Sequence, residues 1–344
     1  MELNGKPIRR ETEIPFNLGS RKQIGEYLVE AGWKPKNYTP TGQPIVDEGT
    51  LSKVKDIPEA QMIAKYLMLQ KRLAQVNSWI KAVEPDGRIR GYVNPNGAVT
   101  GRMTHSSPNV AQVPAGSAPY GKECREIWTV PAGYKLVGMD ASGLELRMLA
   151  HYMNDEAYTN EILTGDIHTA NQLAAGLETR NQAKTFIYAF LYGAGDAKIG
   201  SIVGGTAKDG RGLKEKFLRN TPALRTLRER VGVAAGRGYV LGLDGRRVYV
   251  RSEHAALNTL LQSAGAIVMK KALCLLDEYA KQYKIDYKFI GNIHDEIQTE
   301  VAEKDADWFG KLATSCVEAA GSFFKLNCPL AGDYQVGDNW SQTH

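Results

Sequence analysis

The sequence KLVGMDASGLELR, residues 135–147, decides how this chain can fold. Its apolar run at residues 136–139 predicts a short buried strand, and small residues at 141–143 leave open space beside Asp140. Burying a lone carboxylate is costly unless it is paired or holds a metal. A helix N-cap or a turn is the ordinary role of such an aspartate. The rest of the chain therefore has to decide between a structural and a chemical role.

A second stretch, TRNQAKTFIYAFLYGAG at residues 179–195, predicts a well-bounded helix. A threonine and a glutamine form a capping box at its start, and glycines follow its end. Basic and tyrosine side chains recur at every fourth position and so lie along one stripe of the helix: Arg180, Lys184, Tyr188 and Tyr192. Cations near a helix N-terminus suit a triphosphate, and the aromatic rings suit a base or sugar. The alternative is an amphipathic helix with a solvated basic edge.

A third stretch, FIGNIHDEIQTEV at residues 289–301, predicts two strands joined by a turn that holds His294, Asp295 and Glu296. Alternating apolar and polar residues after the turn indicate the outgoing strand. Asp140 and Asp295 would each end an apolar strand, so they can converge on adjacent strands of one sheet. Paired carboxylates suit hard cations, and two Mg²⁺ ions about 4 Å apart would activate a hydroxyl and neutralise a leaving pyrophosphate.

Further elements are predicted around these stretches. A donor-rich loop covers residues 91–114 and includes Arg102. Helices are predicted at residues 20–31, from 56, at 144–153, at 166–177 with His168, and from 252. The last helix repeats polar side chains every four residues: His254, Asn258 and Gln262. Residues 238–250 predict a hairpin with Asp244 and Gly245 in a type I′ turn.

The composition of the 344 residues bounds the class of protein. With 43% hydrophobic and 24% charged residues, the chain can build a large core and two or three lobes. No apolar run approaches the roughly 20 residues that span a bilayer, and the N-terminus lacks a signal-peptide core. The sequence therefore predicts a soluble cytoplasmic protein, in the host cytoplasm if it is viral, with no membrane partner. Four scattered cysteines without a CxxC pair argue against a zinc site or a disulfide framework.

Charge is unevenly distributed along the chain. The net charge of +5 is only mildly suggestive of a polyanionic partner. Between residues 198 and 251, however, basic residues outnumber acidic ones by roughly three to one. This density favours contact with a nucleic-acid backbone over a merely solvated face.

In order and spacing, the three stretches resemble motifs A, B and C of family A DNA polymerases, the DNA polymerase I family, and in particular the replicative enzymes of short-tailed bacteriophages. Motif A is VGMDASGLELR, motif B is RNQAKTFIYAFLYG and motif C is IHDEIQTEV. TGRMTHSSPNVAQVP, LDGRRVYVRSEHAALNTLLQSAGA and VGDNW also look like family segments. The resemblance covers nearly all of the chain beyond about residue 60.

The resemblance implies an α+β right-hand polymerase fold with an antiparallel palm sheet, helical fingers and a partial thumb. The expected divisions are a distal thumb at 1–85, palm at 86–150, fingers at 151–253 and palm again at 254–344. This polymerase half would add deoxynucleotides to a primer 3′ end by two-metal-ion nucleotidyl transfer. Its partners would be primer–template DNA and deoxynucleoside triphosphates, and its cofactor two Mg²⁺ ions, with Mn²⁺ as a substitute.

The resemblance also implies residue roles. The catalytic residues would be Asp140, Asp295 and Lys184. Metal ligands would be Asp140, the backbone carbonyl of Ala141, Asp295 and, less directly, Glu296. Contacts to the incoming nucleotide would come from Arg180, Lys184, Tyr188, His168, Glu145 and Tyr192, with Glu145 paired to Tyr188 against a 2′-hydroxyl. The duplex would be contacted by Arg102, His254, Asn258 and Gln262, chiefly in the minor groove.

Two rival functions remain open at this point. Single-subunit RNA polymerases share the palm aspartates and a helix with Lys and Tyr, but Glu145 in LELR argues for a deoxynucleotide enzyme. A non-enzymatic DNA-clamping remnant would tolerate loss of Asp140 or Asp295, and both are present. An assay of nucleotide incorporation on a primed template distinguishes a DNA polymerase from an RNA polymerase and from a DNA-clamping protein.

Too few residues precede the palm to build a proofreading domain, so this chain is expected to lack 3′ to 5′ exonuclease activity. Because it begins inside the thumb, low processivity and steep salt dependence are expected. A separate polypeptide would then carry the exonuclease and the remaining thumb helices and would cover the apolar helix at residues 61–76. A truncated chain is the alternative to such a natural split.

Overall fold

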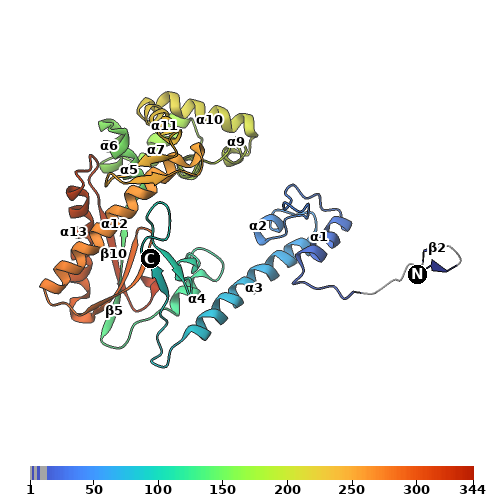
Figure 1. Cartoon of the computed structure of the whole chain (residues 1–344), viewed down its shortest axis with the longest axis horizontal. Helices are drawn as coiled ribbons and strands as arrows, with labels where there is room; N and C mark the ends of the chain where they lie inside the picture. The colour runs from blue at the N-terminus through green and yellow to red at the C-terminus, as the bar shows by residue number, and fades with distance from the viewer. Residues whose placement is uncertain (1, 4–5, 8–13) are drawn as a thin grey trace. The chain divides into compact units, whose positions relative to one another are not determined.

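The computed structural model describes residues 2–3, 6–7 and 14–344, and it divides into two compact units at residues 1–89 and 90–344 (Figure 1). The division after residue 89 lies close to the predicted end of the partial thumb at residue 85, and the assignment of this unit as a thumb stays a prediction. The predicted palm and fingers both lie in the second unit, where buried residues of the sheet and of the helices form one continuous hydrophobic core.

The first unit is mainly helical. Its elements are β1 (Glu2–Leu3), β2 (Lys6–Pro7), α1 (Arg21–Glu30), α2 (Glu48–Leu51) and α3 (Pro58–Ala82). Ser20 caps α1 as its side chain accepts a hydrogen bond from the backbone N–H of Gln23, which explains the predicted start of this helix. The unit has its own small core, in which α3 buries Ile63 and Leu67, whereas Leu73 of the same helix is 56% exposed.

A four-stranded antiparallel sheet forms the centre of the second unit. Its strands are β5 (Tyr134–Ala141), β8 (Tyr287–Ile293), β9 (Glu296–Ala302) and β10 (Gly332–Gly337), in the order β10-β5-β9-β8. The predicted antiparallel sheet with motifs A and C on adjacent strands is thereby confirmed. The two motifs lie side by side although more than 150 residues separate them along the chain.

The outgoing strand predicted after the turn is β9, and the protein covers both of its faces. Residues 296–301 of β9 are all buried, including Gln298 and Glu300. β9 is an inner strand, α13 (Ala306–Phe323) packs on the sheet, and Gln298 on the other face donates a hydrogen bond to the carbonyl of Thr343. A strand covered on both faces loses the exposed side that alternation of polar residues predicts.

Helix α12 (Ala256–Gln282) packs against α13 and α5. The helical stretch Glu253–Gln282 is long and apolar enough to cross a membrane by length and composition, which corrects the expectation that no such run exists. In this fold 61% of its apolar 18-residue window is buried inside the protein, as in a core helix. His254 belongs to the preceding 3₁₀ turn η3 (Glu253–Ala255), so the predicted helix begins two residues later than its polar pattern indicated.

The helices of residues 144–235 follow β5 in the chain and gather at the upper left of Figure 1. They comprise α5 (Leu144–Met153), α6 (Glu156–Leu163), α7 (Ile167–Ala175), α8 (Arg180–Leu191), α9 (Asp196–Gly200), η2 (Ser201–Val203), α10 (Ala207–Asn220) and α11 (Pro222–Ala235). The predicted capping box of α8 is present: Thr179 accepts from the N–H of Gln182, whose side chain accepts from the N–H of Thr179. Phe186 and Phe190 of α8 pack edge-on against Phe217 of α10, and these contacts hold α8 against α10.

A hairpin of β6 (Tyr239–Leu241) and β7 (Arg247–Tyr249) packs on α11 and α12. Its turn is not the predicted type I′, because only Gly245 of the two predicted residues has a positive φ, of 79°. Gly242 and Gly245 close a tight turn, and Gly245 then supplies the left-handed residue of a three-residue loop. The remaining elements are β3 (Tyr92–Asn94), β4 (Thr104–Ser106), η1 (Val110–Gln112), α4 (Gly121–Glu126), η4 (Glu303–Asp305) and η5 (Trp340–Gln342).

Candidate active site

Asp140 and Asp295 lie at the same end of the sheet. Asp140 is the next-to-last residue of β5 and stands in register with Glu296, the first residue of β9. The backbone N–H of Ala141 donates to the carbonyl oxygen of Asp295 at 3.1 Å, which ties the β8–β9 turn to the end of β5. Between Asp295 and β8, His294 has a φ of 63°, an uncommon value for a residue with a side chain.

This end of the sheet concentrates negative charge. Loss of hydration, followed by the nearby carboxylates of Asp295 and Glu296, raises the pKa of Asp140 to about 7. Burial and the carboxylate of Glu145 raise the pKa of Asp295 as well. Two carboxylates that repel each other at the end of an apolar strand create a strong preference for a cation.

Glu296 is held differently from the two aspartates. Its Oε1 accepts hydrogen bonds from Trp340 Nε1 and Gln298 Nε2, both at 2.6 Å, and its Oε2 lies 2.9 Å from His344 Nδ1. Burial opposes ionisation of Glu296, but these three hydrogen bonds prevail and lower its pKa. Both carboxylate oxygens of Glu296 are therefore already engaged by the protein.

Glu145 forms a second polar centre, on the first turn of α5. Its Oε1 accepts from a guanidinium nitrogen of Arg102 at 3.1 Å and from the hydroxyl of Tyr192 at 3.2 Å. The expected partner was Tyr188. Tyr192, one turn further along α8, makes the hydrogen bond instead, and Tyr188 is half-buried with its ring 6.3 Å from that of His168.

The predicted stripe on α8 faces the acidic end of the sheet. The carboxylates of Glu145, Asp295 and Asp140, after burial, are the causes that raise the pKa of Tyr188, so this tyrosine lies near all three. Lys184, one turn before Tyr188, is exposed. Tyr188 and Tyr192 thus lie near carboxylates from distant segments, and Lys184 and Arg180 lie near His168, whose ring is next to that of Tyr188.

At the start of α8, Arg180 is held by the N-cap residue of α7. Its guanidinium donates to both carboxylate oxygens of Asp166, at 2.6 and 3.1 Å, and these hydrogen bonds hold the pKa of Asp166 well below its usual range. Burial and the cations of Arg180 and Lys184 lower the pKa of His168, which lies beside them. His168 Nδ1 is buried with no hydrogen-bond partner among the described residues, so it is an unused polar atom beside two cations.

The four predicted duplex residues do not form one cluster. Arg102 is committed to Glu145, with both side chains about one-fifth exposed. Asn258 and Gln262 lie one turn apart on α12 and are half-buried, and His254 is exposed on the preceding 3₁₀ turn.

Sequence reasoning missed three residues of the acidic end: Asp333, Trp340 and His344. Asp333 stands in register with Asp140 from β10 and accepts a hydrogen bond from the Ser142 hydroxyl at 2.8 Å. Trp340 and His344 hold Glu296 as described above. No spacing within the C-terminal segment indicates that it returns to motif C; the resemblance of VGDNW to a family segment was the only signal.

The donor set at the end of the sheet fits a hard divalent cation. Asp140 and Asp295 offer carboxylate oxygens of the kind that Mg²⁺ prefers, and their pKa values are raised first by burial and then by neighbouring carboxylates. Within the described part of the chain no group of three or more His, Cys, Asp or Glu side chains is arranged to hold a metal by itself. Water and substrate oxygens would complete the coordination of a metal held by two carboxylates.

Comparison with known proteins agrees with this arrangement. A family model described as DNA polymerase family A matches residues 3–342. DNA-directed DNA polymerases of Enterobacteria phage T3 and Escherichia phage T7 are each 43% identical over 382 residues, which cover 99% of this chain and 54% of those proteins. The chain thus spans about half the length of these curated relatives.

A solved structure has the same fold. The POL domain of Pol1 from M. smegmatis, in complex with DNA primer-template and dNTP, superposes with a TM-score of 0.86 at 24% identity, over 95% of this chain and 62% of that one. At this identity the likeness concerns the fold, and it agrees with the right-hand architecture expected from the sequence.

Proposed function

The chain belongs to DNA polymerase family A, and from this premise we propose that it is a template-directed DNA polymerase that adds deoxynucleotides to a primer 3′ end. The observation that carries the proposal is the meeting of Asp140 and Asp295 at one end of the sheet, opposite the stripe of α8. Carboxylates at one wall and cations at the other suit a reaction in which a triphosphate is held and cleaved.

In the proposed mechanism Asp140 and Asp295 would hold two Mg²⁺ ions, with the carbonyl of Ala141 as a further ligand and Mn²⁺ as a substitute. When bound, such a pair supplies Lewis-acid chemistry that activates the primer hydroxyl and neutralises the leaving pyrophosphate. Glu296 would contribute to the metal site less directly, because Trp340, Gln298 and His344 already engage its oxygens.

The nucleotide would be held by α8 and α7. Lys184 and Arg180 would contact the phosphates, and His168 offers its unpartnered Nδ1 beside them. Arg180 would either share its guanidinium between Asp166 and a phosphate or leave Asp166. Tyr188 would pack on the sugar and base, and Tyr192 would lie nearer the templating base.

Glu145 would exclude ribonucleotides. Arg102 and Tyr192 fix its carboxylate where it limits the space beside Tyr188. His254, Asn258 and Gln262 would contact the minor groove of the duplex, where acceptors are present at every base pair. Arg102 would reach the duplex only with the guanidinium N–H groups that Glu145 does not use.

The test is incorporation of one deoxynucleotide on a primed template by the purified chain in Mg²⁺, with the corresponding ribonucleotide in parallel. Template-dependent deoxynucleotide incorporation is expected. Ribonucleotide incorporation at an equal rate would favour the rival single-subunit RNA polymerase, and DNA binding without incorporation would favour a DNA-clamping protein.

Proofreading is not part of the proposed activity of this chain. Digestion of a labelled primer in the absence of nucleotides measures it directly, and we expect none above a metal-free control. A separate polypeptide that contributes an exonuclease and further thumb helices stays a prediction, which co-purification from the native source would test.

A further inference from the structure

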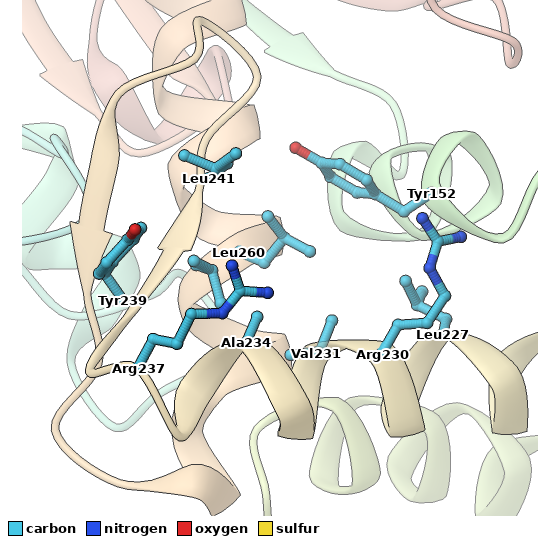
Figure 2. Close-up of a pocket in the computed structure, with 10 residues that line it drawn as sticks. Tyr152, Leu227, Arg230, Val231, Ala234, Arg237, Tyr239, Leu241 and Leu260 are labelled. Carbon is cyan, nitrogen blue, oxygen red and sulfur yellow. The ribbon is translucent and has the colours of Figure 1, made fainter.

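A pocket of 330 Å³ lies away from the sheet end, between α11, the β6 strand, α5 and α12 (Figure 2). Its floor is aliphatic and is formed by Leu227, Val231, Ala234 and Leu260. This volume lies within the range of pockets that bind small organic groups. The proposed polymerase reaction does not use it.

Two cations flank the pocket. Arg230 lies in α11 and Arg237 two residues after its end, and Figure 2 shows both guanidinium groups on the pocket side of the helix, with Val231 and Ala234 between them. Both arginines are exposed, and neither forms an ion pair or a side-chain hydrogen bond with a described residue. Among the residues that line the pocket, the charged ones are Arg230 and Arg237, and none is acidic.

Aromatic rings form the two side walls. Tyr152 of α5 stands on one side and Tyr239 of β6 on the other (Figure 2). The guanidinium of Arg247 lies 4.9 Å above the ring of Tyr239 and adds a third cation. The hydroxyl of Tyr152 is buried without a hydrogen-bond partner among the described residues, and burial followed by the charge of Asp244 raises its pKa to about 12, so it remains a donor.

The pocket is separate from the predicted duplex surface. Leu260 lines it from α12, whereas Asn258 and Gln262 lie two residues to either side. Residues two apart on a helix are about 200° apart around its axis, so Leu260 points away from those two side chains. A ligand in the pocket and a duplex on α12 can be bound together.

We propose that this pocket binds one nucleotide of a single-stranded DNA segment, with the base between Tyr152 and Tyr239 and the flanking phosphates on Arg230 and Arg237. Proteins that bind single strands combine basic side chains with aromatic stacking platforms in this way. Cations on both sides of an apolar pocket suit a base that has a phosphate on each side, whereas a free mononucleotide would use only one. The proposal goes beyond nucleotide addition and does not depend on it.

The first experiment measures binding of fluorescent oligo(dT) to the full chain by anisotropy, alone and after saturation with a non-extendable primer–template. The variant Arg230→Ala/Arg237→Ala should lower the affinity for oligo(dT) about tenfold or more and reduce the slope of log affinity against log salt by about 1.4. The matched control, Arg219→Ala/Arg225→Ala, removes two exposed arginines of α10 and α11 that do not line the pocket. Equal losses in both variants would overturn the proposal.

A second variant separates base insertion from general charge. Ala234→Phe fills the floor but keeps every arginine, and it should weaken oligo(dT) binding at least about fivefold, since base stacking on aromatic side chains is lost. Circular dichroism checks that the variant is folded. In wild type, an oligonucleotide with 4-thiothymidine should crosslink to Tyr152, Tyr239 or their neighbours in α11. Crosslinks confined to other elements, or undiminished binding by folded Ala234→Phe, would contradict the proposal.

Competition with free dTMP distinguishes a pocket for single-stranded DNA from a pocket for a free nucleotide. It should displace oligo(dT) only at a concentration at least about 100-fold above that of unlabelled oligo(dT). Equal potency would assign the pocket to free nucleotides and overturn the single-strand proposal. These experiments measure only binding by the chain and require no nucleotide incorporation. The result of the polymerase assay therefore does not affect the comparison of the variants, and the comparison does not affect the polymerase assay.

Discussion

In the proposed active site, the end of the palm sheet and helix α8 form opposite walls, and these two walls are built in different ways. At the sheet end, Asp140 and Asp295 come from distant segments and meet through the pairing of β5 with β9. On α8, the side chains come from a single segment and are aligned by helical periodicity. The sheet end is acidic and its pKa values are shifted upward, whereas α8 offers cations at its start.

The difference indicates a division of roles. Carboxylates that repel each other suit the binding of metal at the reacting atoms, so their loss should abolish chemistry. Exposed cations on a helix suit the binding of a mobile phosphate, so their loss should affect substrate binding as well as rate. Variants of the two walls should therefore differ in kind as well as in size.

The largest effect is expected at the sheet end. Asp140→Asn or Asp295→Asn should lower the single-turnover rate of incorporation by several orders of magnitude and leave primer–template affinity nearly intact, because each removes a charge that binds metal. Rapid-quench kinetics and anisotropy measure the two quantities. Glu318→Gln, at an exposed position of α13, is the control. A mild loss of rate in both aspartate variants would contradict the assignment.

A smaller and different effect is expected on α8. Lys184→Ala should raise the KM for the incoming nucleotide and lower the rate together, without altering DNA affinity, because the lost cation contacts the triphosphate. Steady-state kinetics with varied nucleotide concentration measure this. The control variant Lys208→Ala removes an exposed cation of α10 and should change neither the KM nor the rate. If only DNA affinity fell in Lys184→Ala, α8 would be a duplex contact.

Glu145 joins the two walls, and its loss should change selectivity more than rate. Glu145→Ala should narrow the preference for deoxynucleotides over ribonucleotides, and Tyr188→Phe should mainly weaken the use of dideoxynucleotides. Tyr192→Phe removes only the 3.2 Å hydrogen bond to Glu145 and should narrow the preference less. The ratio of kcat/KM for deoxynucleotides to kcat/KM for ribonucleotides measures this preference. An unchanged ratio in Glu145→Ala would refute the proposed role.

The smallest effect is expected on α12, beside both walls. Gln262→Ala should slow extension from a matched primer a few-fold at every sequence, because minor-groove acceptors occur at every base pair. Extension rates on templates of differing sequence measure it, with Gln282→Ala at the far end of the same helix as the control. Strong dependence on sequence would argue against contact with the minor groove.

Local signals predicted α8 well. Its capping box and its stop lie within the segment that they bound, and the stripe from Arg180 to Tyr192 follows from 3.6 residues per turn. The partner of Glu145 was not predicted correctly, because the choice between Tyr188 and Tyr192 depends on how α8 sits against α5. The alternating pattern of β9 predicted the strand correctly but not its burial on both faces, because that burial depends on α13 and the C-terminal residues.

The sequence by itself determined the motifs, their order, the strands and helices that carry them, and the family to which the chain belongs. Helix periodicity and capping act over a few residues, so a reader of the sequence can follow them. Only the tertiary structure decided that His344 and Trp340 hold Glu296, that Asp333 faces Asp140, and that two arginines and two tyrosines surround one pocket. These contacts join segments far apart in the chain, and their geometry follows from sheet register and helix packing, which no local pattern encodes.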